Sequence, residues 1–245
     1  MTTVNGKRTH DGAAIGIIML DTVFPRIPGD IGNANTFSFP VRYKIVQGAS
    51  PQRVVKEADS RLLEPFIEAA QSLEKEGVKA IATGCGFLAI FHPELVNAVD
   101  IPVFSSSLLE VHMAHAMINR RRKVGVLTAR ARSLTDRHFA GVGIQDIPMV
   151  VMGMEDAEEF TGAFIEGKPS LDPEKVRKEM VRAAEKLATS HPDIGALVLE
   201  CTNMPPYANA IQEVLKVPVF DVVTMIRHIH ASLERQEFQG SMGIF

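Results

Sequence analysis

The chain contains two cysteines, Cys85 and Cys201, and each follows a short apolar run where a strand would give way to a helix. The first run reads Ala80-Ile-Ala-Thr-Gly-Cys85 and the second reads Ala196-Leu-Val-Leu-Glu-Cys201. At the start of a helix, free backbone N–H groups and the positive end of the helix dipole stabilise a thiolate, the reactive form of cysteine. We therefore expect two reactive thiols.

The two cysteines occupy equivalent positions when the sequence is compared with itself. A shift of 116 residues lays the segment from Val78 to Phe104 on the segment from Ile194 to Phe220 without a gap, and the two cysteines coincide. The simplest account is two copies of one α/β unit, with strand ends that face each other across a cleft. Ligands of open parallel sheets bind beyond the carboxyl ends of the strands, so one site flanked by both thiols is predicted.

Two thiols on opposite walls of one cleft can act as acid and base on opposite faces of a bound carbon atom. One thiolate removes a proton from the carbon next to a carboxylate, while the opposing thiol delivers a proton to the other face. Because such a carbon is a very weak acid, the cleft must also stabilise the developing negative charge. This arrangement predicts stereoinversion and demands no metal, pyridoxal phosphate or other cofactor.

Groups that can hold a substrate follow the predicted strands. Gly84 and Gly86 flank the first cysteine and allow close approach of the backbone. Arg26 stands in a loop rich in proline and glycine after the first strand, where it either binds a substrate carboxylate or is a surface arginine on a turn. Thr128 ends the first strand of the second copy, where a carboxylate contact is predicted. Asp21, at the end of the first strand, either orients a substrate ammonium group or caps the turn.

The residues around the cysteines carry a family resemblance. The sequence TGCGF surrounds Cys85 and ECTNMPP surrounds Cys201, and Cys201-Thr202-x-x-Pro205 matches a Cys-Thr-x-x-Pro pattern. With the two-copy layout, the chain resembles the aspartate/glutamate/hydantoin racemase family. The resemblance implies a cofactor-independent enzyme in which both cysteines are catalytic and in which Thr202 and Asn203 help to hold the substrate.

One departure from the family pattern lies at the first cysteine. Gly86-Phe87 follows Cys85, where amino-acid racemases of the group commonly have Asn-Thr, so an apolar wall replaces two polar contacts. The expected function is an isomerase, a racemase of an amino acid or related compound that carries a carboxylate. The alternatives are an enzyme resembling maleate isomerases or arylmalonate decarboxylases, and a non-catalytic two-lobed protein that binds a small molecule.

The expected fold is α/β, with two pseudo-symmetric domains, mainly parallel sheets and the active-site cleft between them. Strands are predicted at Ala14 to Leu20, Val78 to Thr83, Ile101 to Phe104, Lys123 to Thr128, Ile194 to Leu199 and Val217 to Phe220. Amphipathic helices are predicted at Ser60 to Glu76 and Pro173 to Ser190, the second with Asp172 as its N-cap. By the resemblance, residues 1–105 with 222–245 form the domain of Cys85, residues 106–221 form the domain of Cys201, and a helix from Met225 to Gln236 packs on the first domain.

Composition narrows the class of protein further. The 245 residues are 46% hydrophobic and 22% charged with a net charge of -3, which argues against nucleic acid or an anionic membrane as the main partner. Only two cysteines and no HExxH or Cys-His cluster occur, so a metal site is not expected. The polar start of the chain resembles no signal peptide and no apolar run of membrane-spanning length occurs, so a cytoplasmic protein is expected. The apolar residues 242–245 either mark a homo-oligomer contact or form a frayed tail.

Overall fold

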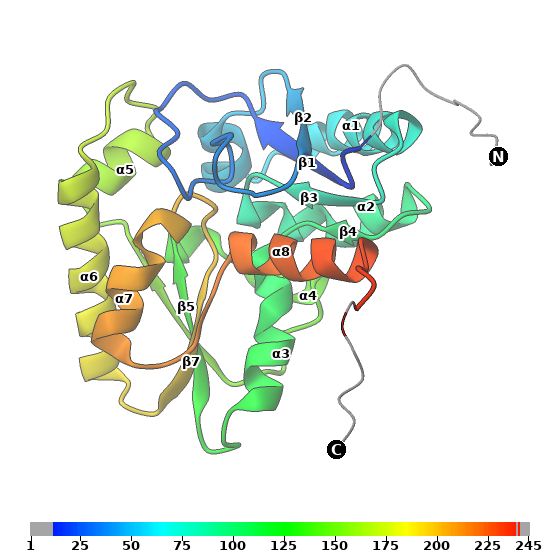
Figure 1. Cartoon of the computed structure of the whole chain (residues 1–245). Coiled ribbons are helices and arrows are strands. Elements are labelled where there is room, and N and C mark those ends of the chain that lie inside the picture. The colour runs from blue at the N-terminus through cyan, green and yellow to red at the C-terminus, as the bar shows by residue number, and fades with distance from the viewer. Residues whose placement is uncertain (1–11, 239, 241–245) are drawn as a thin grey trace, which may run out of the picture.

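The computed structural model describes residues 12–238 and residue 240, and these form two lobes that are each built on a four-stranded parallel sheet (Figure 1). The first sheet has the order β2-β1-β3-β4, with β1 (Ile15–Leu20), β2 (Val41–Val46), β3 (Ala80–Thr83) and β4 (Val103–Phe104). The second sheet has the order β6-β5-β7-β8, with β5 (Lys123–Thr128), β6 (Met149–Gly153), β7 (Ile194–Leu199) and β8 (Val219–Phe220). The strand orders are equivalent, so the prediction of two matching α/β units with parallel sheets is confirmed.

Helices cover both sheets, as crossover connections between parallel strands require. They are α1 (Leu63–Glu76), α2 (His92–Asn97), α3 (Glu110–Met117), α4 (Asp136–Gly141), α5 (Glu158–Phe164), α6 (Pro173–Ser190), α7 (Ala208–Leu215) and α8 (Val222–Leu233). The predicted α6 has the expected bounds, because the Asp172 side chain accepts hydrogen bonds from the backbone N–H groups of Glu174 and Lys175 and Pro173 occupies the first turn.

The inner strands of each sheet are well predicted by apolar runs in the sequence. Every residue of β1, β3 and β7 is buried, which explains why their sequences are continuous apolar runs. The sequence interpretation missed β2 and β6, which pair on one side only within the described residues and are partly exposed. The edge strand β2, Val-Arg-Tyr-Lys-Ile-Val, has no apolar run to reveal it, whereas β6, Met-Val-Val-Met-Gly, has one that the interpretation overlooked.

The short strands β4 and β8 differ from their predicted lengths for a shared reason. Each is two residues long and follows a proline, Pro102 or Pro218, which has no N–H to donate to a ladder. Each proline still accepts a hydrogen bond at 2.9 Å through its carbonyl oxygen, from the N–H of Ile81 or of Leu197. The two halves therefore share this detail as well as the strand order.

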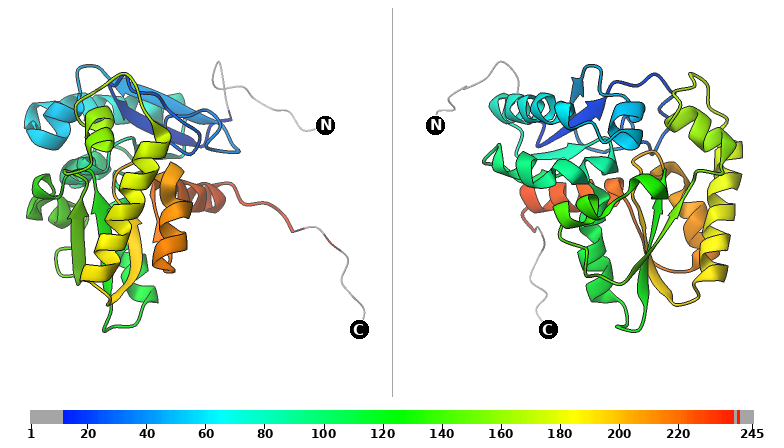
Figure 2. Two further views of the ribbon diagram at one scale, coloured as in Figure 1. Left: turned by 90° about the vertical axis from the view of Figure 1, so that its left-hand side faces the viewer. Right: turned by 180° about the vertical axis from the view of Figure 1, so that it is seen from behind.

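The last helix crosses back to the first sheet. The apolar face of α8, including Val222, Ile226 and Ile229, packs in one buried cluster with Ile17 of β1 and Ala82 of β3, and Figure 2 shows α8 beneath the first lobe from two further sides. Asp221 starts this helix earlier than predicted, since its side chain accepts hydrogen bonds from two backbone N–H groups of the first turn. Residues 242–245, where an oligomer contact was considered, lie outside the described residues.

No helix within the described part of the chain has both the length and the apolar character needed to cross a bilayer.

Candidate active site

One pocket brings the two cysteines together. It lies beyond the carboxyl ends of β1, β3 and β7, and both lobes line it. The first lobe contributes Leu20, Thr22, Phe24, Arg26, Pro51, Val55, Gly84, Cys85, Gly86 and Phe87, and the second contributes Ala129, Phe164, Ile165, Cys201, Thr202 and Asn203. The internal sequence repeat predicted a cleft at the strand ends with residues from both lobes, and the pocket has this geometry.

Cys85 lies between β3 and a helical turn over Gly86–Phe91. Its backbone is extended, and the N–H groups of Phe87 and Leu88 lower the pKa of its thiol, as a helix start should. Burial and the nearby Glu200 outweigh them and raise the pKa of Cys85 to about 12. In the free protein this thiol therefore rests in its protonated form, contrary to the expectation of a stabilised thiolate.

Cys201 follows β7 and is less buried than Cys85. Its thiol donates to Asn203 Oδ1 at a sulfur–oxygen distance of 3.5 Å. Burial, the carboxyl group of Glu200 and the charge that a Cys85 thiolate would carry raise its pKa well above the ordinary value, against a lowering contribution from the Asn203 N–H. A thiolate at Cys85 therefore disfavours a second thiolate at Cys201.

Glu200, which the sequence interpretation left unassigned, is a fully buried carboxyl group beside this pocket. Its Oε2 accepts a hydrogen bond from Thr128 Oγ1 at 2.7 Å, and its Oε1 has no partner among the described residues. Burial raises its pKa to about 7, against the lowering effect of Thr128. The sequence did carry a signal for Glu200, because an acidic residue directly follows the apolar run of β7. Burying a charge at the end of such a strand costs free energy, so an acidic residue there indicates a functional or structural role.

A polar network joins the loop after β1 to the turn of the second cysteine. Arg26 pairs with Asp30 at 2.9 Å and donates to Thr22 Oγ1 at 2.8 Å. The buried Asp30 also accepts from the N–H of Gly32 at 2.8 Å and from Asn203 Nδ2 at 2.7 Å. The network places Arg26 in the pocket wall and connects it through Asp30 to the side chain that contacts the Cys201 thiol.

The predicted substrate contacts at the cysteine turns all line the pocket. Thr202 Oγ1 donates to the carbonyl oxygen of Gly84 at 2.7 Å and so ties the two turns together. Gly84 is in close contact with Met19, where an added Cβ would lie 2.5 Å from the sulfur. At Gly86 an added Cβ would overlap both Oε1 and the carbonyl oxygen of Glu200. Gly86 therefore allows the two lobes to approach closely behind the thiols, whereas Gly84 makes room for Met19 of its own lobe.

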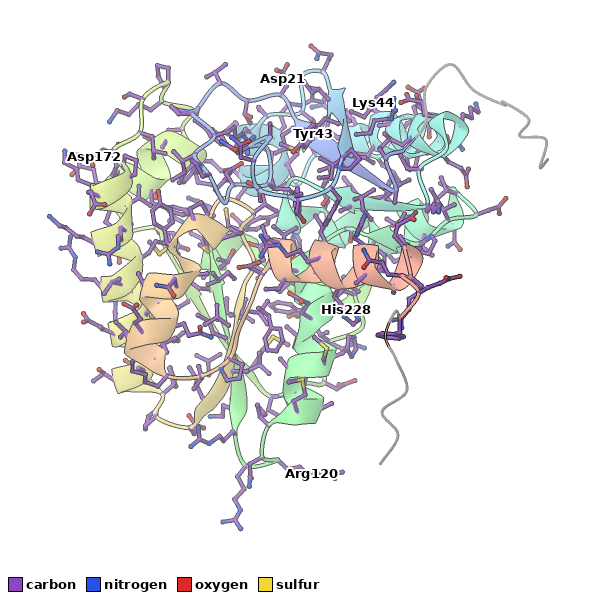
Figure 3. All side chains as sticks on the ribbon, in the orientation of Figure 1. Asp21, Tyr43, Lys44, Arg120, Asp172 and His228 are labelled. Carbon is purple, nitrogen blue, oxygen red and sulfur yellow. The ribbon has the colours of Figure 1, made fainter. Side chains whose placement is uncertain are left out.

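Two predicted substrate contacts lie elsewhere. Asp21 is exposed at the outer edge of the first lobe (Figure 3), and its carboxylate accepts from the N–H of Gly48 at 3.2 Å. It caps a turn there and does not line the pocket. Thr128 is fully buried and its hydroxyl is used by Glu200, so the expected direct contact with a carboxylate is replaced by a contact behind the pocket wall.

Aromatic rings form much of the apolar wall. Phe24 and Phe164 meet edge to face with ring centroids 5.0 Å apart, one from each lobe. The guanidinium of Arg26 lies 4.2 Å from the centroid of Phe24. Phe87 was expected to be an apolar wall, whereas Phe24 and Phe164 were missed because no local pattern brings them to the thiols. The faces of such rings attract cations.

Among the described residues no three His, Cys, Asp or Glu side chains are grouped so as to hold a metal ion.

Comparisons with known proteins identify relatives of this chain. A family profile described as Asp/Glu/Hydantoin racemase matches residues 46–227. A dimethylsulfoniopropionate lyase from Durusdinium sp. clade D is 33% identical over 218 residues, which are 86% of this chain and 72% of that protein. Dimethylsulfoniopropionate lyase 7 from Emiliania huxleyi is 28% identical over 90% of this chain and 67% of that protein. An allantoin racemase structure from Klebsiella pneumoniae shares the fold with a TM-score of 0.61 at 18% identity, covering 90% of this chain and 89% of that one.

These findings correct the expected reaction. The curated relatives at 24–33% identity are named as lyases, so the interpretation as an isomerase that racemises an amino acid is wrong. The resemblance in fold and family was sound, but abstraction of a proton next to a carboxylate is a step that elimination and racemisation share. The alternative of a lyase on the same fold, considered as a decarboxylase-like enzyme, is closer to the finding.

Proposed function

Since the chain belongs to the Asp/Glu/Hydantoin racemase family, we propose that it is a lyase of that family that cleaves dimethylsulfoniopropionate into dimethyl sulfide and acrylate. The observation that carries the proposal is its similarity to dimethylsulfoniopropionate lyases over most of its length. The pocket supports it with a base, an apolar wall and a cation in one place.

The substrate has two charged ends, and the pocket offers a partner for each. Phe87 and Phe164 give the sulfonium end an aromatic surface, to which a weakly hydrated cation is attracted, whereas the face of Phe24 is covered by Arg26. Arg26 is the charged side chain among the described residues that line the pocket, and it binds the carboxylate end. This pairing orients the carbon next to the carboxylate between the two thiols.

The reaction is an elimination that needs one base. A thiolate takes the proton from the carbon next to the carboxylate, the C–H electron pair becomes the double bond of acrylate, and the C–S bond electrons leave with neutral dimethyl sulfide. A neutral leaving group requires no proton, so no acid is needed on the opposite face. We assign the base to Cys85, since its sulfur has two backbone N–H groups beside it whereas Cys201 has one. Cys201 stays protonated and donates to Asn203.

A cationic substrate also solves the problem of the raised thiol pKa. A low-dielectric pocket that already faces Glu200 disfavours a further negative charge. The sulfonium group brings a positive charge into the same space and lowers the pKa of the adjacent thiol on binding. The base therefore forms when the correct substrate is present. Since both cysteines are free thiols, a reducing compartment such as the cytoplasm suits the enzyme.

The test is to incubate the purified chain with dimethylsulfoniopropionate and measure dimethyl sulfide by gas chromatography and acrylate by NMR. We expect both products in equal amounts, a loss of about 10²–10⁴-fold for Cys85→Ser, and a smaller loss for Cys201→Ser. The reverse order of the two losses would overturn the assignment of the base. Binding of the substrate without release of dimethyl sulfide would identify a binding protein and overturn the lyase proposal.

A further inference from the structure

The Asp30 side chain is fixed against the turn that follows Cys201. The hydroxyl of Thr36 donates to the carbonyl oxygen of Asp30 at 2.6 Å and accepts from the N–H of Gly29 at 3.1 Å, which holds the backbone around Asp30 in place. Gly29 has a φ of 95°, and a Cβ added there would lie 3.0 Å from the Cα of Pro206. This loop of the first lobe therefore packs directly on the Cys201 turn of the second, and Asp30 is only 2% exposed.

The Asp30 carboxylate determines which way the Asn203 amide is turned. Its Oδ1 accepts from Arg26 Nη1 at 2.9 Å and from the N–H of Gly32 at 2.8 Å, and its Oδ2 accepts from Asn203 Nδ2 at 2.7 Å. A carboxylate paired with a guanidinium offers acceptors only, so it must face the NH₂ end of the amide. The carbonyl end of the amide is then left for another partner.

That partner is the Cys201 thiol, which donates to Asn203 Oδ1 at 3.5 Å. An oxygen acceptor beside sulfur favours the thiol, which can donate to it, and repels the thiolate, which cannot. The sulfur of Cys85 faces two donors instead, the N–H groups of Phe87 and Leu88, which favour the thiolate. Cys201 has one such N–H group, from Asn203. The two cysteines are equivalent in the sequence repeat but not in their hydrogen bonding.

We infer that Asn203, held by Asp30, fixes Cys201 as a thiol and thereby restricts the pocket to chemistry with one base. This inference rests on the proposed lyase function. Inversion by two bases requires each cysteine to exist as the thiolate in turn, because each removes the proton from its own face. Elimination of a sulfonium group needs one base, so a second cysteine held as a thiol does not impede it. Asn203 and Asp30 act through the sulfur of Cys201, so they are positioning residues that determine which reaction the pocket performs.

A single base predicts that proton removal is stereospecific. With the substrate held by Arg26 at one end and by the aromatic rings at the other, the two hydrogen atoms next to the carboxylate face different lobes of the pocket. The thiolate of Cys85 reaches one of them. The thiol of Cys201 takes neither, so the wild-type chain should remove only one of the two prochiral hydrogen atoms.

The first experiment needs no substrate. Infrared spectroscopy records the S–H stretching bands of the wild-type chain, Cys85→Ser and Cys201→Ser, and the two variants assign each band to its cysteine. We expect a Cys201 band at neutral pH, at a lower wavenumber than that of a thiol without a hydrogen bond, since donation weakens the S–H bond. The absence of a Cys201 band, or a band at the position of a free thiol, would overturn the inference.

The second experiment identifies the acceptor. Asn203→Ala removes the amide, so the Cys201 band should move to higher wavenumber, toward that of a free thiol. Asn209→Ala is the matched control, because Asn209 is exposed on α7 of the same lobe and its amide donates to Glu213 at 3.1 Å. The control should leave the Cys201 band in place. An unmoved band in Asn203→Ala, or an equal shift in both variants, would contradict the assigned hydrogen bond and overturn the inference.

The third experiment follows the stereochemistry of the elimination. Dimethylsulfoniopropionate with one deuterium next to the carboxylate is prepared in both configurations, and NMR measures the deuterium that remains in acrylate. With the wild-type chain, one configuration should lose its deuterium and the other should keep it. In Asn203→Ala the Cys201 thiolate is no longer opposed by the amide oxygen, so both configurations should lose deuterium. A variant that is slower but equally stereospecific would show a structural role and overturn the inference.

The outcomes distinguish the two proposals. If the wild-type chain releases no dimethyl sulfide but has the hydrogen-bonded Cys201 band, the lyase function is overturned and the assignment of Cys201 as a thiol donor is supported. If dimethyl sulfide is released and the Cys201 band is that of a free thiol, the assignment alone is overturned. Should Asn203→Ala not fold, the wild-type chain decides, because loss of deuterium from both configurations there would overturn the inference.

Discussion

Asn203 Nδ2 donates to Asp30 Oδ2 at 2.7 Å, although 173 residues separate the two side chains along the chain. The same amide accepts from the Cys201 thiol through its Oδ1. Asp30 in turn holds Arg26, so one carboxylate orients both the amide beside the thiol and the cation in the pocket. The first lobe thereby determines the geometry of a cysteine that belongs to the second.

Replacing Asp30 with asparagine should disturb both partners. The new amide would set an NH₂ group against Asn203 Nδ2 and would leave the Arg26 guanidinium without its counter-charge. We expect the free energy of unfolding to fall by about 1–3 kcal/mol and kcat/KM to fall by about tenfold or more. Chemical denaturation and the dimethyl sulfide assay measure the two effects.

Asp21→Asn is the matched control for this change. Asp21 is exposed and its carboxylate accepts one hydrogen bond, from Gly48, at 3.2 Å. Its replacement should alter stability by less than about 0.5 kcal/mol and leave activity unchanged. Equal effects of the two substitutions would contradict the role given to Asp30.

Gly86 should not tolerate a methyl group. The Cβ of alanine would overlap the carboxyl group and the backbone carbonyl of Glu200, and backbone cannot move aside cheaply. We expect Gly86→Ala to lower the free energy of unfolding by about 1–3 kcal/mol and to abolish activity by parting the two cysteine turns. Gly162→Ala in α5 is the control, since its Cβ would meet one flexible side chain at 3.9 Å. Alanine there should stabilise the helix by about 0.5–1 kcal/mol.

Phe164 should contribute to affinity through its ring. Phe164→Leu keeps an apolar wall but removes the aromatic face, so KM for dimethylsulfoniopropionate should rise by about 2- to 30-fold. Inhibition by isocaproate, which has a carbon in place of the sulfonium sulfur, should change by less than about twofold. Phe160→Leu is the control, because Phe160 packs on Phe164 with centroids 4.9 Å apart but does not line the pocket. An equal loss of affinity for both ligands would rule out recognition of the charge.

Glu110 should make stability depend on pH. Burial and the neighbouring Asp221 raise its pKa to about 8 from an ordinary 4.5, so the folded chain binds a proton that the unfolded chain releases. Stability from this group is therefore complete below about pH 4.5 and is lost as the pH rises toward 8. We expect Glu110→Gln to match the wild-type chain near pH 5 and to be more stable by about 1–3 kcal/mol at pH 8. Denaturation midpoints at both pH values test this, and a constant difference between them would contradict it.

The sequence alone determined the architecture and the two cysteines that meet in the pocket. Buried parallel strands are continuous apolar runs, and a repeated strand–cysteine–helix segment specifies two equivalent units, so β1, β3, β5 and β7 and both thiols could be found locally. The motif after Cys201 was specific enough to identify the family, because the residues that form a turn next to a strand are adjacent in the chain.

Only the tertiary structure decided how those thiols behave. Three contacts in and around the pocket join residues from distant segments, which no local pattern relates. They are the hydrogen bond of Thr128 to Glu200, that of Asn203 to Asp30, and the edge-to-face contact of Phe24 with Phe164. The sign of the thiol pKa shift followed from burial, which a helix start could not reveal. Proton abstraction next to a carboxylate is shared by racemases and lyases, so motifs for that step could not separate them. The difference depends on what occupies the rest of the pocket, and chain folding assembles that wall from both lobes.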